Sequence, residues 1–130
     1  MNNICIIPAR SGSKRIKNKN IINFFGKPLI YWSILAAKKS RLFSKIYIST
    51  DSKKIINLKK KYKVDFLERS KKNSSDNASV HSVIRESILK LQNNGIMLDN
   101  ICCILPTAVL INYRNLIKSF KMFKKNRSKF

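Results

Sequence analysis

Short apolar runs alternate with longer amphipathic segments along this chain. Four apolar runs predict β-strands, at residues 3–7, 45–49, 64–67 and 100–105. Four longer segments predict helices, at residues 28–39 and 52–62, between Asn77 and Gly95, and from Tyr113 onwards. Strict alternation of strands and helices is typical of βαβ units. It predicts an α/β fold: a three-layer sandwich around a mainly parallel, Rossmann-like sheet with right-handed crossovers.

Individual segments make further predictions. The run NICCIL at 100–105 is apolar throughout, which is typical of a strand buried on both faces. Asp76 or Asn77 can cap the third helix, and Gly95 ends it. The core stripe of that helix is expected to be Val80, Val83, Ile84, Ser87, Ile88 and Leu91. The last helix is expected to bury Leu116, Ile117, Phe120 and Phe123.

Three segments follow predicted strands and are candidates for a binding site. Ligands of open parallel sheets bind beyond the carboxyl ends of the strands. The candidates are therefore the loop at 8–20, the segment STD at 49–51 and the segment PTA at 106–108.

The loop at 8–20 has the composition of a phosphate site. Ser11, Gly12 and Ser13 are small and let backbone N–H groups approach an anion. Arg10, Lys14 and Lys19 add charge-assisted hydrogen bonds. The nucleotide-binding patterns GxxxxGK[ST] and GxGxxG are both absent, so a solvated basic loop is the alternative interpretation.

Length and composition favour one globular domain. The chain has 130 residues, 44% of them hydrophobic, and single domains commonly hold about 100 to 150 residues. Cys5, Cys102 and Cys103 lie in apolar runs without metal-ligand spacing, and we expect buried, reduced thiols. His81 has no carboxylate in register, so we expect a structural role. No apolar run reaches the roughly 20 residues of a membrane span, and no signal-peptide pattern opens the chain, so we expect a cytoplasmic protein.

The net charge of +22 leaves a second function class open. Lys and Arg residues that neutralise phosphates supply most non-specific affinity for nucleic acids. The lysines are nevertheless scattered over every segment together with many Asn and Ile residues. We therefore interpret most of the charge as background composition, with a basic nucleic-acid-binding module as the alternative.

Five motifs occur in order along the chain: IIPARSGSKRIKNKNI with GKPLIYWSI, then IYISTDS, RSKKNSSDNAS and CCILPTA. Together they resemble the CMP-sialic acid synthetases, the cytidylyltransferases of nonulosonic acids. The double-Cys strand before PTA is most similar to the pseudaminic acid branch. The resemblance implies a fold of the nucleotide-diphospho-sugar transferase type. It also implies transfer of CMP from CTP to a nine-carbon acidic sugar, with release of pyrophosphate and assistance from Mg²⁺.

The resemblance also implies roles for individual residues. Arg10 and Lys19 would be catalytic. The nucleotide-binding residues would be Arg10, Ser13, Lys14, Lys19, Asn20, Arg69 and Ser79. Pro106 and Thr107 would contact the sugar. Asp51 would either cap the following helix or contact a ligand.

The chain departs from the family pattern at several positions. Ser11 replaces a Gly, Ser70 replaces a Pro, Lys17 stands where Pro is common, and Leu105 and Val109 differ on either side of PTA.

The resemblance covers the N-terminal, nucleotide-binding part of the family. We therefore expect residues 1–130 to form a single domain, with the dimerisation element, the acidic ligands of Mg²⁺ and the C-terminal part missing. On this basis we expect no turnover from these residues alone. The other outcomes left open are an N-acetylneuraminic or legionaminic acid cytidylyltransferase and a fragment that folds poorly.

Overall fold

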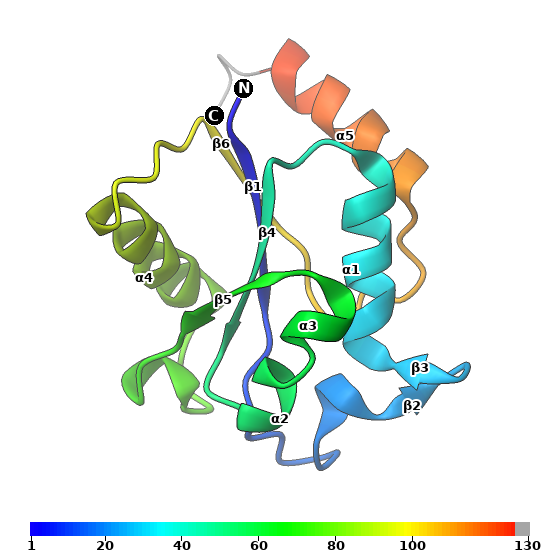
Figure 1. The fold of residues 1–130 in the computed structure, drawn as a ribbon, viewed down its shortest axis with the longest axis vertical. Helices are drawn as coiled ribbons and strands as arrows, with labels where there is room; N and C mark the ends of the chain where they lie inside the picture. The colour runs from blue at the N-terminus through cyan, green and yellow to red at the C-terminus, as the bar shows by residue number, and fades with distance from the viewer. Residues whose placement is uncertain (127–130) are drawn as a thin grey trace.

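The centre of the molecule is a four-stranded parallel sheet. In the computed structural model, which describes residues 1–126, the strand order is β5-β4-β1-β6 (Figure 1). The strands are β1 (Asn3–Pro8), β4 (Lys45–Thr50), β5 (Asp65–Glu68) and β6 (Asn100–Cys103). All three pairings are parallel, with Ile4 opposite Lys45, Tyr47 opposite Asp65 and Asn3 opposite Asn100. The predicted parallel sheet is thereby confirmed.

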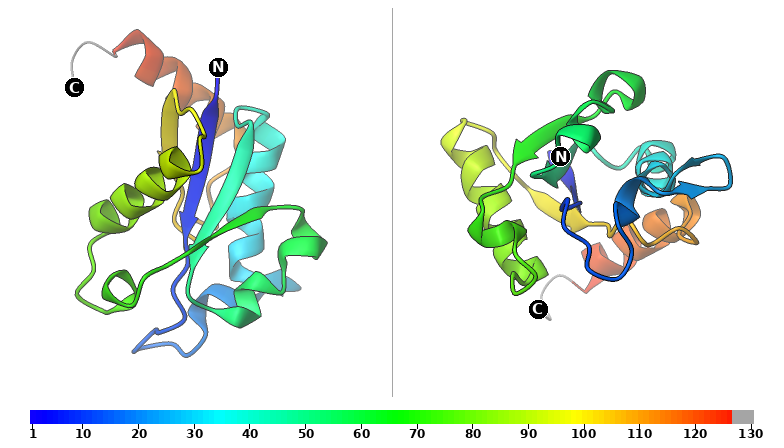
Figure 2. Two further views of the ribbon diagram at one scale, coloured as in Figure 1. Left: turned by 60° about the vertical axis from the view of Figure 1, so that its left-hand side comes forward. Right: turned by 90° about the horizontal axis from the view of Figure 1, so that it is seen from below.

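Helices cover both faces of this sheet. α4 (Val80–Asn93) lies on one face, and α1 (Leu29–Ser40) and α5 (Tyr113–Lys125) lie on the other (Figures 1 and 2). Alternate residues of β1 point to opposite faces, and each face has its own buried cluster. Ile4 and Ile6 pack in the cluster that includes Leu91, whereas Cys5 and Ile7 pack in the cluster that includes Leu116. These clusters make the predicted three-layer sandwich.

A small hairpin follows the first loop and was not predicted. It consists of β2 (Asn23–Phe24) and β3 (Lys27–Pro28), which pair antiparallel. Phe25 and Gly26 both have positive φ, 50° and 80°, as a tight hairpin turn requires. Pro28 belongs to β3 and precedes α1, so that helix begins one residue later than predicted.

The predicted helix at 52–62 is wrong as a single element. It forms two short helices, α2 (Lys53–Ile56) and α3 (Lys59–Tyr62). The N–H of Leu58 donates to the carbonyl of Ile55 at 2.9 Å, a tight three-residue turn that ends α2. Both helices still contribute to the core, because Ile55 and Tyr62 are buried.

The start of α4 also differs from the prediction. Its N-cap is Ser79, whose Oγ accepts a hydrogen bond from the N–H of Ser82 at 3.1 Å, rather than Asp76 or Asn77. The short 3-10 helix η2 (Lys72–Ser74) precedes it. Val83, Ser87 and Leu91 are buried as predicted, but Val80 in the first turn is 45% exposed. Gly95, with φ 76°, follows the end of the helix as predicted.

Strand β6 is an edge strand, which corrects several predictions. Among residues 1–126 it pairs only with β1, so its side chains are less covered than those of a central strand. It ends at Cys103, and that residue is exposed while Cys102 is half-buried. Of the three free thiols only Cys5 is buried. Phe123 at the end of α5 is 42% exposed rather than buried.

Two further observations concern the surface of the molecule. His81 is exposed on α4, and its side chain is not part of either core cluster. Of the helices within residues 1–126, none has both the length and the apolar character needed to cross a membrane.

Candidate active site

A cleft of about 230 Å³ lies beyond the carboxyl ends of the strands. These ends are at the bottom of the sheet in Figure 1. The loops after β1, β5 and β6 contribute to its walls. It is lined by Pro8, Arg10, Ser13, Lys19, Asn20, Arg69, Ala78, Val80, Leu105, Pro106 and Thr107. The structure therefore brings together all of the predicted site residues except Lys14 and Ser79.

These two residues occupy different positions. Lys14 lines an adjoining hollow together with Arg15. The side chain of Lys14 is 80% exposed. Ser79 uses its hydroxyl to cap α4, although its neighbours Ala78 and Val80 line the cleft. The hydroxyl of Ser79 is thus committed to the helix rather than directed into the cleft.

A short turn near the end of the first loop places Lys19. Asn18 adopts the left-handed conformation, with φ 53°, and its carbonyl accepts a hydrogen bond from the N–H of Ile21 at 3.0 Å. The resulting 3-10 helix η1 (Lys19–Ile21) carries Lys19 and the buried Asn20. Nδ2 of Asn20 donates to the carbonyl of Arg10 at 3.0 Å. Asn20 thereby joins the two ends of the loop.

Asp51 fastens the first loop to the end of β4. Its Oδ1 accepts a hydrogen bond from the N–H of Ser11 at 2.7 Å, and its Oδ2 accepts one from Oγ of Ser11 at 2.6 Å. Partial burial raises the pKa of Asp51, but the hydrogen bonds from Ser11 outweigh this effect and the pKa lies below its ordinary value. Asp51 is not the cap of α2, because Ser52 accepts the hydrogen bond from Ile55. Ser11 does not have a positive φ, so a serine fits this position without strain.

Asp76 is a site residue that sequence reasoning missed. Its carboxylate binds Nη1 of Arg10, and Nζ of Lys14 lies 2.9 Å from its other oxygen. Hydrogen bonds from Arg10 and Lys14 hold the pKa of Asp76 below its ordinary value. The sequence indicates Asp76 only as a possible helix cap. Arg10 and Lys14 therefore converge on a negatively charged group in the hollow that adjoins the cleft.

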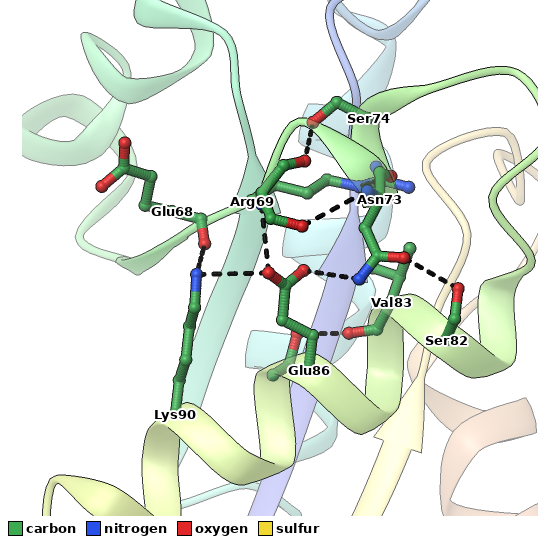
Figure 3. Close-up of polar contacts among 10 residues, drawn as sticks. Glu68, Arg69, Asn73, Ser74, Ser82, Val83, Glu86 and Lys90 are labelled. Carbon is green, nitrogen blue, oxygen red and sulfur yellow. Dashed lines mark hydrogen bonds and ion pairs between the residues drawn. The ribbon is translucent and has the colours of Figure 1, made fainter.

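Arg69 follows β5 and is held from two sides. Its N–H donates to the carbonyl of Thr50 at 3.0 Å, and its Nε donates to the carbonyl of Asn73 at 2.7 Å (Figure 3). Only 9% of the residue is exposed. Burial lowers the pKa of the guanidinium, and the charge of Asp51 opposes this effect. Arg69 thus brings a fixed positive charge to the wall of the cleft.

In the turn after Arg69, Ser70 stands where the family pattern has a proline, and its backbone N–H makes a hydrogen bond. The N–H of Ser70 donates to Oε1 of Glu86 at 3.1 Å, a hydrogen bond that a proline could not make. Oε2 of Glu86 accepts a hydrogen bond from Nδ2 of Asn73 at 2.9 Å. Glu86 was also missed by sequence reasoning, because nothing in the sequence indicates that α4 packs against this turn.

The segment after β6 also lines the cleft. Pro106 is buried, while Thr107 is exposed. The carbonyl of Leu105 accepts hydrogen bonds from Oγ of Ser33 at 2.9 Å and from the N–H of Ala108 at 3.0 Å. The segment is therefore fixed to α1 by Ser33 and presents Thr107 to the cleft.

The acidic residues near the cleft do not form a metal site. Within residues 1–126 there is no group of three or more His, Cys, Asp or Glu side chains that could hold a metal ion. Asp51 and Asp76 are each bound to protein donors. The donor set described here does not fit the Mg²⁺ implied by the resemblance, and we derive no chemical step through that ion.

Comparisons with known proteins agree with the fold and with the resemblance. The family model described as cytidylyltransferase matches residues 4–130. The chain is 45% identical over 132 residues to a pseudaminic acid cytidylyltransferase of Campylobacter jejuni, a match that covers 100% of this chain and 56% of that protein. It is 39% identical over 131 residues to a Helicobacter pylori protein named pseudaminic acid cytidylyltransferase and UDP-2,4-diacetamido-2,4,6-trideoxy-beta-L-altropyranose hydrolase, covering 98% of this chain and 25% of that one.

A solved structure of CMP:2-keto-3-deoxy-manno-octonic acid synthetase complexed with CTP is similar in fold. It has a TM-score of 0.80 and 18% sequence identity, and the match covers 98% of this chain and 49% of that chain. The chain thus spans about half the length of the Campylobacter relative, 56%, and a quarter of the Helicobacter protein. With a family model matched over residues 4–130, this chain belongs to the cytidylyltransferase family.

Proposed function

We propose that this protein binds CTP in the cleft and transfers CMP to a nonulosonic acid, with pseudaminic acid as the favoured acceptor. The observation that carries the proposal is the convergence of Arg10, Lys19 and Arg69 on one cleft at the carboxyl ends of parallel strands. The names of the Campylobacter and Helicobacter relatives support the acceptor, and the CTP complex of the structural neighbour supports the donor. Residues 1–130 would form the nucleotide-binding domain.

The proposed reaction needs positive charge more than it needs a nucleophilic side chain. The anomeric hydroxyl oxygen of the sugar forms a bond to the α-phosphorus of CTP and loses its proton. The bond from that phosphorus to the bridging oxygen of pyrophosphate breaks, and charge develops on the leaving group. Lys19 would neutralise that charge, and Arg10 would bind phosphate oxygens through its several N–H donors. Ser13, Lys14, Asn20 and Arg69 would complete the contacts to the nucleotide.

The acceptor would enter from the side of Pro106 and Thr107, which line the same cleft as Arg10, Lys19 and Arg69. Mg²⁺ and a homodimeric assembly remain expectations of the resemblance, and a cytoplasmic location remains an expectation of the sequence. No step above depends on them.

Titration calorimetry with CTP tests the binding step. Lys19→Ala is expected to weaken CTP binding about tenfold, the equivalent of one charge-assisted hydrogen bond. Lys17→Ala is the matched control, because Lys17 is in the same loop but does not line the cleft. Equal weakening by both variants would mean that only the general positive charge matters. Competition between CTP and an unrelated DNA duplex at constant ionic strength separates the proposal from a nucleic-acid-binding module.

Release of pyrophosphate from CTP tests the transfer step. In a protein that carries this domain together with the C-terminal part of the family, pseudaminic acid is expected to be the preferred acceptor over N-acetylneuraminic and legionaminic acids. Turnover by the 130-residue chain would contradict the expectation, drawn from the resemblance, that these residues do not catalyse alone.

A further inference from the structure

Glu86 lies outside the cleft but is connected to it through a chain of hydrogen bonds. From α4 it accepts the N–H of Ser70 at 3.1 Å and Nδ2 of Asn73 at 2.9 Å, and Nζ of Lys90 lies 3.5 Å from the same carboxylate (Figure 3). One carboxylate therefore holds the backbone at one end of the turn and a side chain at the other.

Asn73 connects Glu86 to Arg69, because it makes hydrogen bonds with both residues. Asn73 is buried, and its side chain is held at both ends: Nδ2 donates to Glu86, and Oδ1 accepts from Oγ of Ser82 at 2.9 Å. With the side chain fixed, the backbone carbonyl of Asn73 has a fixed direction. That carbonyl accepts the 2.7 Å hydrogen bond from Nε of Arg69 (Figure 3). The bond uses one of the five N–H donors of the guanidinium and leaves the terminal ones for another partner.

The negative charge of Glu86 also favours the charged form of Arg69. Arg69 and Arg10 repel each other, and the carboxylates of Asp51 and Glu86 compensate for this repulsion. The Lys90 contact alone does not account for Glu86, because an ion pair four residues apart on an exposed helix face stabilises little. Two hydrogen bonds to the turn are the larger part of what this carboxylate does.

We propose that Glu86 is a positioning residue: it fixes the turn at 70–73 and, through the carbonyl of Asn73, the direction in which Arg69 presents its guanidinium to nucleotide phosphates. The identity of the ligand rests on the proposed function, whereas the geometry does not. Loss of Glu86 would release Asn73 and allow the guanidinium to turn within the wall of the cleft.

NMR of the ¹⁵N-labelled chain tests the geometry without any nucleotide. The Nε–H signal of Arg69, assigned with Arg69→Lys, is expected to exchange slowly with solvent in the wild type. In Glu86→Ala it is expected to shift and to exchange at the rate of an exposed arginine. Glu86→Gln keeps the shape and one acceptor, so intermediate protection is expected, and this variant remains informative if Glu86→Ala folds poorly. Glu68→Ala is the matched control, because its carboxylate is directed away from Glu86 (Figure 3).

CTP titration supplies the second readout. Glu86→Ala is expected to weaken CTP binding about tenfold, as loss of one well-aligned charge-assisted hydrogen bond would. Glu68→Ala removes the same charge and is expected to bind as the wild type. Unchanged protection of the Arg69 Nε–H in both Glu86 variants would overturn the positioning role. Absence of CTP binding by the wild type would instead overturn the proposed function, and the NMR result would still decide the role of Glu86.

Discussion

The two short hydrogen bonds from Ser11 to Asp51 allow a quantitative prediction of stability, because they connect only these two residues. Hydrogen bonds to a charged group contribute about 1.5–3 kcal/mol each, and exposure to solvent reduces this to about 1 kcal/mol here. Asp51→Ala is therefore expected to lower the free energy of unfolding by about 2 kcal/mol. Ser11→Ala removes only the hydroxyl bond and is expected to lower it by about 1 kcal/mol.

A double-mutant cycle measured by urea denaturation at pH 7 isolates the interaction. The variant that carries both changes is expected to be no less stable than Asp51→Ala, which gives a coupling energy of about 1 kcal/mol. Glu68→Ala controls for the loss of one negative charge in a chain of net charge +22. A coupling energy below about 0.3 kcal/mol would refute the reasoning, because it would show that the hydroxyl and carboxylate do not stabilise one another.

The pH dependence of the same cycle follows from the lowered pKa of Asp51. A carboxyl group whose pKa is lower in the folded state stabilises the fold above its unfolded pKa of about 3.9. That stability is lost as the pH falls through the folded pKa. The difference in stability between the wild type and Asp51→Ala is thus expected to be constant between pH 7 and pH 5 and to shrink below about pH 3.9. A difference that grows on acidification would contradict the assigned hydrogen bonds.

The remaining predictions concern the core, the cations and the thiols. Leu91→Ala is expected to lower the free energy of unfolding by about 2–5 kcal/mol, while Leu89→Ala, at a position 50% exposed, changes it by less than about 0.5 kcal/mol in the same urea assay. Asp76→Asn frees the cations that Asp76 binds, so calorimetry at low salt should give tighter CTP binding, with a difference that disappears at high salt. A maleimide probe is expected to modify Cys103 slowly in the native protein, because the residue is exposed while burial of its thiol and the neighbouring Cys102 raise the pKa to about 11. Cys5 is expected to react only after unfolding, as measured by mass spectrometry, because burial raises the pKa of the Cys5 thiol and blocks access to it.

The elements predicted well are those whose pattern depends on local sequence. β1 is buried along its whole length, and an apolar run bounded by polar residues indicates this directly. The elements predicted badly depend on neighbours far along the chain. The run at 100–105 would look the same in a central strand, and only the number of paired strands makes β6 an edge. Asp76, Asn77 and Ser79 are all residue types that cap helices well. In the structure Ser79 caps α4, while Asp76 binds Arg10 instead.

In the candidate site, too, the positions of some residues could be predicted from the sequence and their partners could not. Arg10, Lys19 and Arg69 could be placed near one another, because the carboxyl ends of parallel strands meet at one edge of the sheet. The partners of these cations could not be predicted. The contact between Arg10 and Asp76 spans 66 positions of the chain, and its formation depends on how two loops fold against each other. Side-chain pairing across loops is thus the information that the sequence pattern lacks.

The central position of β1 has a consequence for synthesis of the protein on the ribosome. β1 emerges well before β6, because Asn3 pairs with Asn100, 97 positions later. At about 5–20 residues per second, β1 waits roughly 5–20 s for this partner. During that time its isoleucines, which end fully buried, can contact other nascent chains or chaperones. A central strand of the finished sheet thus keeps one edge unpaired until β6 has been made.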